Sequence, residues 1–471
     1  MIDFSDFPGD ASPIEYLLEI SKIPRPSGHT DKIADHLVEF AKKHALEYSR
    51  DRFNNVIIRK PATPGKESAP AVIIQGHTDI VAVKEPGVEI DMTREGLECY
   101  RDGDFIRARG TSLGADDGVA IAYGLALLAS KTIPHPQLEV LLTSDEETSL
   151  VGATNLDADG IAGRMLINID SDEEGIFTVG CAGGARCDIS LPVVREHSKK
   201  RRFEISLSGC QGGHSGIEID KGRTNAIVAL CGAIKLIPDV RLVSLSGGVA
   251  DNAIPSSATA IVAADAIPSK ALSEYFENIR KAEPALRFTI KESDDVAPPM
   301  SLESSIRAID LILKEICGVV KMSGDIPGLV ETSANIGIAY SDELSISITI
   351  SVRSSKNSEK DRVIAEIGRI ADDHLAECSV RGGYPAWEYK TESALRDLAC
   401  EVYRECYGSD PKVITIHAGL ECGIFADKIE GLDCISLGPD NFDIHTTAEH
   451  LSISSFLRVW EYLKALLSKI N

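Results

Sequence analysis

The sequence has few aromatic residues, no excess of basic charge and no long apolar segment. Aromatic side chains make up 5% of the 471 residues, and the formal net charge is −23. This charge argues against nucleic acids and anionic membranes as partners, because both would repel it. No apolar run approaches the about 18–20 residues that a membrane-spanning helix requires. The first ten residues, MIDFSDFPGD, have neither a basic segment nor an apolar core, so we expect no secretory leader.

Paired cysteine motifs are missing as well. The eleven cysteines are odd in number and scattered, and no Cys-x-x-Cys motif occurs. This pattern is typical of reduced thiols rather than of a disulfide framework, and it predicts a cytoplasmic protein. Hydrophobic residues make up 43% of the chain and charged residues 26%, as in ordinary globular proteins of two or three domains.

The N-terminal part of the chain predicts an α/β sheet. Two helices and a strand pair are expected first, over residues 13–21, 30–45 and 46–60, with a cap at Thr30 or Asp31 and a turn at Asn54-Asn55. Three short apolar runs follow, each ending in polar residues: AVIIQGHTD (71–79), LEVLLTSDEE (138–147) and RMLINIDSDEEG (164–175). Such runs are typical of buried strands in a sheet that helices cover on both faces.

The pattern changes after Gly180. Strands with amphipathic alternation, such as RRFEISLSG and ELSISITISVRSS, are interleaved with helical stretches at 223–236, 269–283 and 357–373. From about residue 390 a helix and a strand resume the first pattern. We therefore predict a three-layer α/β catalytic domain with a mostly parallel mixed sheet (1–184 and 387–471). It carries an inserted α+β lid domain with an antiparallel sheet (185–386), which is long enough for two related halves.

Acidic residues and histidines stand where the predicted buried strands end. Ligands bind outside the carboxyl ends of strands in open α/β sheets, so residues far apart in sequence can converge there. The candidates are His77, Asp79, Asp116, Asp117, Asp145–Glu147 and Asp170. Each also has an ordinary structural interpretation: a satisfied core histidine, a helix cap at Asp116, or a solvated acidic loop at the glutamates.

A mixed set of carboxylate and imidazole ligands is typical of sites for zinc, manganese or cobalt. It differs from the sulfur-rich ligand set of structural zinc sites. Paired ions about 3.5–4 Å apart activate water in aminopeptidases and related hydrolases. One of two adjacent glutamates can bind metal while its neighbour takes a proton from water. Near the C-terminus, His445 and His450 are rival candidates for a further ligand.

Several motifs in one order resemble the aminoacyl-histidine dipeptidases. These belong to a metallopeptidase superfamily that also holds carnosinases, other dipeptidases and glutamate-releasing carboxypeptidases. The motifs are GHTD, ARGTSLGADDG, LTSDEE, INIDSDEEG, GGHSG, ADNAIP and HAGLECG, and the match runs from about residue 14 to the last helix. The resemblance implies a peptidase with two divalent metal ions, most simply zinc, that cleaves dipeptides of the Xaa-His type.

The resemblance also implies a role for each matched residue. The metal ligands would be His77, Asp116, Glu147, Asp170 and His445, with Asp116 bridging both ions. His445 is preferred over His450 because HTTAE aligns with the family's His-Ser-Pro-Asp-Glu stretch. Glu146 would be the general base, Asp79 would orient His77, and the lid residue His214 would stabilise the oxyanion, so that lid closure would be needed. The residues implied for substrate binding are Asn252, Arg353 and Glu421.

The chain departs from the family pattern at two places. Asp117 stands where the family usually has Asn, which adds negative charge beside the metals, and Thr447-Ala448 replaces the usual Pro-Asp. Two other functions stay open: an N-acyl amino acid deacetylase or carboxypeptidase of the same superfamily, and a non-catalytic binding protein on this fold. A homodimer is a further expectation, since the insert is long enough to carry a dimer interface or to replace one.

Overall fold

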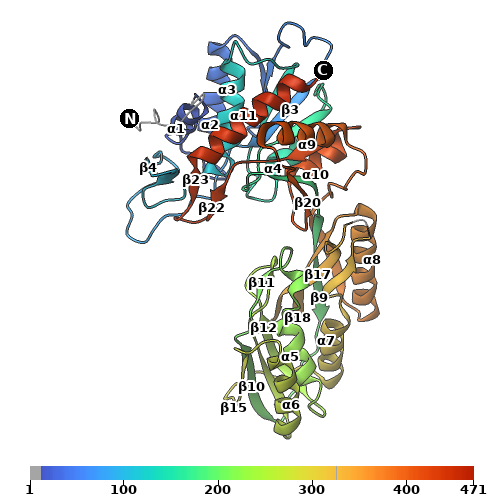
Figure 1. Ribbon diagram of the computed structural model, residues 1–471. Coiled ribbons are helices and arrows are strands. Elements are labelled where there is room, and N and C mark those ends of the chain that lie inside the picture. Colours follow the sequence, from blue (N-terminus) through green and yellow to red (C-terminus); the bar gives the residue numbers. More distant parts are fainter. Residues whose placement is uncertain (1–11, 325) are drawn as a thin grey trace. The chain divides into compact units, whose positions relative to one another are not determined.

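The computed structural model describes residues 12–324 and 326–471, which form two compact units (Figure 1). Unit 1 comprises the residues up to Gly180 together with Tyr389–Thr415 and Leu420–Asn471, and unit 2 comprises Cys181–Glu388 and Ile416–Gly419. The N-terminal segment in which we expect no leader lies outside the described residues. None of the helices formed by the described residues is long and apolar enough to cross a membrane.

Unit 1 is built on an eight-stranded mixed sheet with the strand order β1-β2-β6-β3-β7-β21-β8-β20. Its strands are β1 (Glu47–Arg50), β2 (Val56–Lys60), β3 (Val72–His77), β6 (Leu138–Thr143), β7 (Met165–Asn168), β8 (Ile176–Cys181), β20 (Lys412–Ile416) and β21 (Asp433–Ser436). β3 pairs in parallel with β6 and with β7, so that His77 lies opposite Thr143 and Gln75 lies opposite Asn168. The carboxyl ends of these three strands therefore meet at one edge of the sheet.

Helices of unit 1 cover the sheet (Figure 1). They are α1 (Ser12–Ile20), α2 (Asp31–Lys43), α3 (Ala115–Ala129), α4 (Val151–Asn155), α9 (Ala394–Tyr407), α10 (Glu421–Lys428) and α11 (Ile453–Lys469). Helices α1, α2, α3, α9 and α11 share one hydrophobic core with the sheet, and α4 and α10 contact each other outside it. Ile73 and Ile74 point to opposite faces of β3, and both are fully buried. Both faces of the sheet are thus covered, as predicted for continuous apolar strands.

A smaller sheet of unit 1 holds the C-terminal loop of the site. Its strand order is β22-β23-β5-β4, formed by β4 (Cys99–Asp102), β5 (Phe105–Ala108), β22 (Asn441–Phe442) and β23 (His450–Ser452). Residues 443–449 connect β22 to β23, and β23 pairs with β5. The strand β5 precedes the segment that leads into α3, so the small sheet connects the two loops discussed below.

Unit 2 contains a nine-stranded antiparallel sheet with helices on one face (Figure 1). One half runs β10 (Arg201–Ser208), α5 (Ala226–Ile234), β12 (Arg241–Gly247), β14 (Ala258–Ala264), α6 (Ser269–Arg280) and β15 (Arg287–Glu292). The other runs β9 (Gly183–Pro192), α7 (Leu302–Lys314), β17 (Val330–Ser341), β18 (Ser345–Ser354), α8 (Asn357–Asp373) and β19 (Glu377–Tyr384), with β16 (Gly318–Met322) added against β17. The order of elements is the same in both halves, and β12 pairs with β17 to join them.

The expected fold class, an α/β catalytic part with a mixed sheet and an α+β part with an antiparallel sheet, is confirmed. The helix expected at 357–373 is observed at those bounds, and those expected at 13–21 and 30–45 differ by one or two residues at their ends. Thr30 is the N-cap residue of α2, as expected, but its side chain makes no capping hydrogen bond. The Thr30 hydroxyl accepts a hydrogen bond from Asn54 at 3.2 Å instead, because the β1–β2 turn lies against this helix end.

Candidate metal centre

Asp116 lies at the centre of the candidate site, at the start of α3. Its Oδ1 is 2.9 Å from His77 Nε2 at the end of β3, and its Oδ2 is 3.1 Å from His445 Nε2 in the 443–449 loop. One carboxylate thus faces two imidazoles that belong to opposite ends of the chain. A carboxylate that offers one oxygen to each side is suited to bridge two cations.

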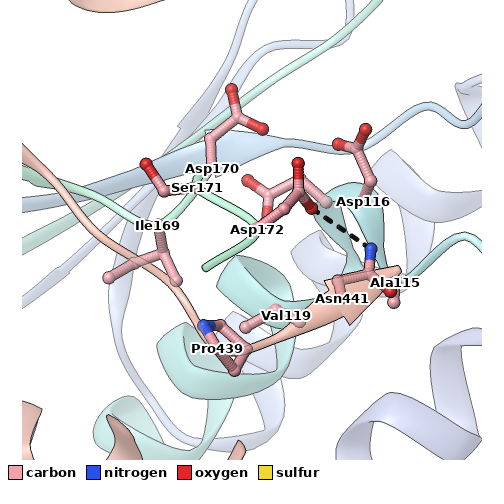
Figure 2. A pocket seen from close by; sticks show the side chains of 10 residues that line it. Ala115, Asp116, Val119, Ile169, Asp170, Ser171, Asp172, Pro439 and Asn441 are labelled. Atoms are coloured by element: carbon pink, nitrogen blue, oxygen red, sulfur yellow. Dashed lines mark hydrogen bonds between the residues drawn. The ribbon is translucent and has the colours of Figure 1, made fainter. Parts of the chain in front are cut away.

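Two overlapping groups of ligand atoms share Asp116. One consists of His77, Asp116 and Asp170, and the other of Asp116, Glu147 and His445; within each group the ligand atoms lie within 4.8 Å of one another. His77 Nε2 is 3.6 Å from Asp170 Oδ1, and His445 Nε2 is 2.8 Å from Glu147 Oε1. Figure 2 shows Asp116 and Asp170 around a small pocket that Asp172 and Asn441 also line. The five residues expected to bind metal are therefore brought together in unit 1.

Asp79 is fully buried and contacts both sides of this arrangement. Its Oδ1 lies 3.4 Å from His77 Nδ1 and accepts the Glu146 backbone N–H at 3.0 Å. Its Oδ2 accepts the Glu147 N–H at 3.3 Å and the Ser27 hydroxyl at 2.8 Å. The hydrogen-bond partner of His77 Nδ1 is the Asp79 backbone carbonyl, at 3.1 Å. An oxygen at this nitrogen fixes the ring and its tautomer, so the backbone of Asp79 supports the orienting role that was expected of its carboxylate.

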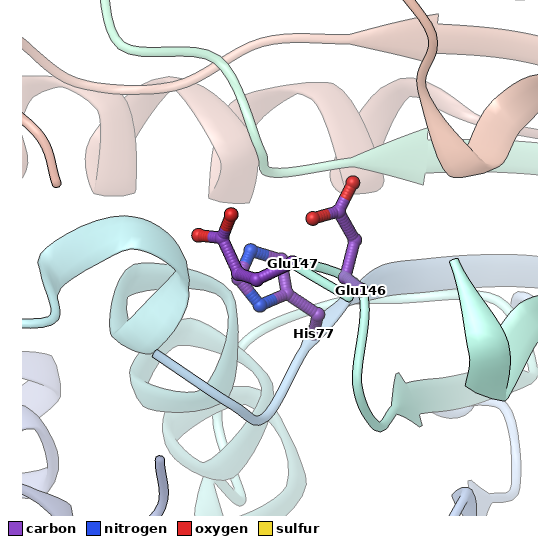
Figure 3. A group of neighbouring side chains, drawn as sticks. All are labelled: His77, Glu146 and Glu147. Atoms are coloured by element: carbon purple, nitrogen blue, oxygen red, sulfur yellow. The ribbon is translucent and has the colours of Figure 1, made fainter. Parts of the chain in front are cut away.

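Glu146 and Glu147 follow β6 and point the same way from adjacent positions, with His77 beside them (Figure 3). These three residues form a third group whose ligand atoms lie within 4.8 Å of one another. Glu147 also contacts His445, whereas burial raises the pKa of Glu146 well above its ordinary value. A carboxylate with a raised pKa is a better proton acceptor near neutral pH, which fits a general base.

The pKa values of His77 and His445 are both higher than that of an isolated imidazole. Burial opposes the charge on His77, yet hydrogen bonds to Asp116, Asp170 and Asp79 raise its pKa well above the ordinary value. Hydrogen bonds to Asp116 and Glu147 raise the pKa of His445 to about 10. Burial raises the pKa of Asp170 to about 6. In the absence of cations, protons therefore balance the carboxylates of this site, and a bound cation must displace them.

This balance predicts that the metal-free protein loses stability as pH rises from 7 to 9. The His445 pKa is raised from 6.5 to about 10, so its contribution is complete below 6.5 and is lost as pH approaches 10. Burial also raises the pKa of Asp172 from 3.8 to about 8, so ionisation of this acid costs stability from about pH 4 upward and adds to the loss up to about pH 8. Thermal unfolding of chelator-treated protein at pH 7, 8 and 9 measures the effect.

Two further measurements make this pH test specific. Metal-loaded protein is expected to show a larger gain in melting temperature over the metal-free form at pH 9 than at pH 7, because fewer protons then compete with the ions. The His445→Asn variant should flatten the pH dependence of the metal-free form. A metal-free melting temperature that is equal or higher at pH 9 would contradict the assignment.

Asp117 takes the helix-capping role that the sequence suggested for Asp116. Its Oδ1 accepts the Ala120 N–H at 3.0 Å, and its Oδ2 accepts the His77 backbone N–H at 3.2 Å. This approach requires Gly76, since a Cβ there would lie 2.0 Å from the Asp117 carboxylate. Burial raises the pKa of Asp117 well above its ordinary value. Asp117 thus supports the backbone that carries His77.

The 443–449 loop presents His445 and directs His450 elsewhere. The His450 ring stacks on Phe442 and meets the edge of Phe105, with centroids 5.1 Å and 4.9 Å away. His445 has a left-handed backbone with φ of 61°, which is uncommon for a residue other than glycine. Thr446 holds this turn, because its hydroxyl donates to the Asp443 carbonyl at 2.6 Å and accepts the Ala448 N–H at 3.1 Å. The loop therefore closes without the proline usual in the family.

The residue expected to stabilise the oxyanion, His214, and two residues expected to bind substrate, Asn252 and Arg353, lie in unit 2. His214, in β11 (Gly213–His214), pairs with β13 (Ala253–Ile254), and the Asn252 carbonyl accepts the Ser215 N–H at 2.8 Å. His214 Nδ1 accepts the N–H groups of Gly216 and Ile217, so the neutral ring carries its proton on Nε2 and can donate there. Burial, with the Arg353 charge second, lowers the pKa of His214 and favours this neutral form.

Arg353 lies on β18 and is 8% exposed. Its Nη1 donates to the Tyr384 hydroxyl at 3.1 Å, and its buried Nε has no hydrogen-bond acceptor among the described residues. The arginine thus retains donors for a planar anion such as a carboxylate. His417, which the sequence did not single out, is a second buried group of this unit: its Nε2 lies 2.8 Å from the Ser333 hydroxyl.

Glu421 begins α10 and is fully buried against the ends of β3 and β6. Its Oε2 accepts hydrogen bonds from Gln75 at 2.5 Å and from the Thr143 hydroxyl at 2.7 Å. Gln75 in turn accepts from Asn168 at 2.7 Å. Burial raises the Glu421 pKa to about 7. Glu421 therefore joins β3 to β6, with β7 reached only through Gln75, and its contact with substrate stays a prediction.

Fold and site together define a metal-dependent hydrolase. Residues 73–469 match the family described as "Peptidase family M20/M25/M40". The chain belongs to this peptidase family, and the resemblance read from the motifs is confirmed at that level.

Two relatives match nearly the whole chain. The cytosol non-specific dipeptidase of Escherichia coli (strain K12) is 35% identical over 466 residues, which cover 96% of each chain. The crystal structure of aminoacylhistidine dipeptidase from Vibrio alginolyticus is 33% identical, covers 99% of each chain and superposes with a TM-score of 0.90. A tripeptidase structure from Staphylococcus aureus, 18% identical with a TM-score of 0.60 and 98% of each chain covered, shares the fold.

Proposed function

We propose that this protein hydrolyses dipeptides, with Xaa-His dipeptides among its substrates, using two divalent metal ions. The observation that carries the proposal is Asp116, whose two oxygens face His77 and His445, with Glu147 and Asp170 completing the two groups. Two imidazoles and three carboxylates form a donor set that suits zinc, with manganese and cobalt as alternatives. Three negative charges near one another also favour cations at this place.

The protein's own side chains handle the proton in this mechanism. Bound divalent cations would polarise the peptide carbonyl and lower the pKa of water. Glu146 takes a proton from the attacking water as its oxygen bonds to the carbonyl carbon, and gives this proton to the leaving amine as the C–N bond breaks. The Nε2–H of His214 is assigned to the developing oxyanion, a contact typically worth about 2.7–4 kcal/mol. Arg353 and Asn252 are assigned to the substrate, Arg353 to its carboxylate.

The proposal divides the chain into a catalytic domain (1–184 and 387–471) and an inserted lid domain (185–386). It also places the protein in the cytoplasm, supported by the scattered cysteines and by a relative named for the cytosol. A homodimer stays a prediction, which light scattering on the purified protein tests.

A substrate panel tests the proposed function. Metal-reconstituted protein is expected to cleave Xaa-His dipeptides and other dipeptides with free amino termini. Tripeptides, N-acetyl dipeptides and N-acetyl amino acids are expected to be cleaved at least tenfold more slowly, and chelator-treated protein is the control. Cleavage of the N-acetyl amino acids alone would support a deacetylase, whereas cleavage of none would support a binding protein.

A further inference from the structure

The loop that carries Asp116 is held by a buried carboxylate from the other end of the chain. Glu449 Oε2 accepts the backbone N–H groups of Leu113 and Gly114 at 2.7 and 2.8 Å. Its Oε1 accepts those of Ala115 at 2.8 Å and Asp116 at 3.4 Å. Glu449 is 3% exposed, and both of its oxygens accept hydrogen bonds from this loop. It thus fixes four consecutive peptide groups that end at the Asp116 backbone.

A buried arginine holds the same loop through a carbonyl. Arg25 is 1% exposed, and its Nη2 donates to the Gly114 carbonyl at 2.6 Å. Its Nη1 donates to the carbonyls of Thr78 at 2.9 Å and Asp79 at 3.4 Å, directly after His77. Arg25 therefore ties the Asp116 loop to the end of β3. Glu449 binds backbone N–H groups of this loop, and Arg25 binds a backbone carbonyl of the same loop. We refer to these two residues as the loop clamp.

Glu449 also connects two candidate metal ligands. It stands four residues after His445 in the loop between β22 and β23. Its backbone N–H donates to the Thr446 carbonyl at 3.3 Å, which joins it to the turn that presents His445. The loop that carries His445 thereby also fixes the loop that carries Asp116. The relative position of these two ligands depends on Glu449.

We propose that Glu449 and Arg25 are positioning residues that hold Asp116 so that its two oxygens serve two cations. This inference rests on the ligand role given to Asp116 in the proposed function. Neither residue takes part in bond making, so loss of the clamp should weaken metal binding and leave the chemical step intact once metal is saturating. Loss of a residue that orients a ligand typically costs about 10–100-fold in metal affinity.

Zinc binding to chelator-treated protein tests the clamp. In competition with a chromophoric chelator, Glu449→Gln is expected to bind Zn²⁺ about 10–100-fold more weakly than the unaltered protein. Its kcat should recover to within a few fold at high Zn²⁺, with KM unchanged. Glu139→Gln is the matched control, because Glu139 is 1% exposed and accepts the N–H groups of Ala162 and Gly163 at the far end of β6. That variant should keep its Zn²⁺ affinity even though it loses stability.

The outcomes separate the clamp from the proposed ligand set. Equal losses of Zn²⁺ affinity in Glu449→Gln and Glu139→Gln would show that the loss follows from lower protein stability in general. That result would refute the positioning role of Glu449. Full affinity in Glu449→Gln, with affinity lost in Asp116→Ala, would also overturn it. Full affinity in Asp116→Ala would instead refute the ligand assignment. If Glu449→Gln does not fold, Arg25→Lys, which keeps the charge but loses the planar fork, gives the same test and the same expected loss.

Discussion

Replacing Glu146 with Gln is expected to lower kcat by about 10²–10⁴-fold, which is what a general base typically contributes, while the bound metal is retained. Glutamine keeps the shape of the side chain but accepts no proton from water. The backbone N–H of this residue remains bound to Asp79, so the loop and the Glu147 carboxylate should stay in place. Steady-state kinetics on an Xaa-His dipeptide, with metal content measured on the same sample, gives both quantities.

Asp145→Asn is the matched control for this substitution. Asp145 is the preceding acid in the same loop, and its Oδ1 accepts the Gly28 N–H at 2.6 Å, outside the three groups of candidate ligand atoms. We expect this variant to keep kcat within a few fold. Near-normal activity of Glu146→Gln with full metal content would refute the role of Glu146 and would make it a ligand or a bystander in the group it forms with His77 and Glu147.

Removing the metal is expected to abolish hydrolysis and to lower the melting temperature. The carboxylates of Asp116, Asp170 and Glu147 lie close together, and two cations would neutralise them. A ligand present at 1,000 times its Kd stabilises the folded protein by about 4 kcal/mol, so the shift should amount to several degrees even for a chain of this size. Calorimetry and activity assays before and after chelation measure both effects.

Adding single metals back identifies the ion. Zn²⁺, Mn²⁺ and Co²⁺ should each restore some activity, because all three accept imidazole and carboxylate ligands. Mg²⁺ should restore little, since it prefers an octahedral shell of oxygens. Full activity after the metal content has fallen below about one tenth of an ion per chain would contradict a metal-dependent mechanism and with it the proposed function.

The sequence could not decide the roles of residues whose neighbours come from distant parts of the chain. Asp116 and Asp117 are adjacent and chemically identical, and the sequence suggested a helix-capping role for Asp116. The structure turns Asp117 to the N–H groups of His77 and Ala120 and turns Asp116 to two histidines. Asp117 can approach His77 because residue 76 is glycine, and the backbone N–H of Asp116 is bound by Glu449. Neither Gly76 nor Glu449 is close in sequence to these two acids.

The supporting residues were the hardest to foresee. In the sequence, Glu449 is recognisable only as the last residue of the HTTAE motif. Arg25 lies in a proline-rich loop that has no periodic pattern. Both act through backbone groups of Leu113–Asp116, and such contacts leave no spacing signal. The one clue available was that a buried arginine or glutamate needs partners, and burial itself is a property of the fold.

The sequence by itself determined the covered mixed sheet, the inserted antiparallel part and the set of acids and histidines, because these follow from local periodicity and from motifs at strand ends. The tertiary structure decided how these residues meet. It placed His445 rather than His450 at Asp116, although the two candidate histidines differ by only five positions. It also placed Glu421 against Gln75 of β3 and Thr143 of β6, and it placed Glu449 and Arg25 around one loop. Such long-range pairings depend on strand order and loop closure, which local sequence patterns do not encode.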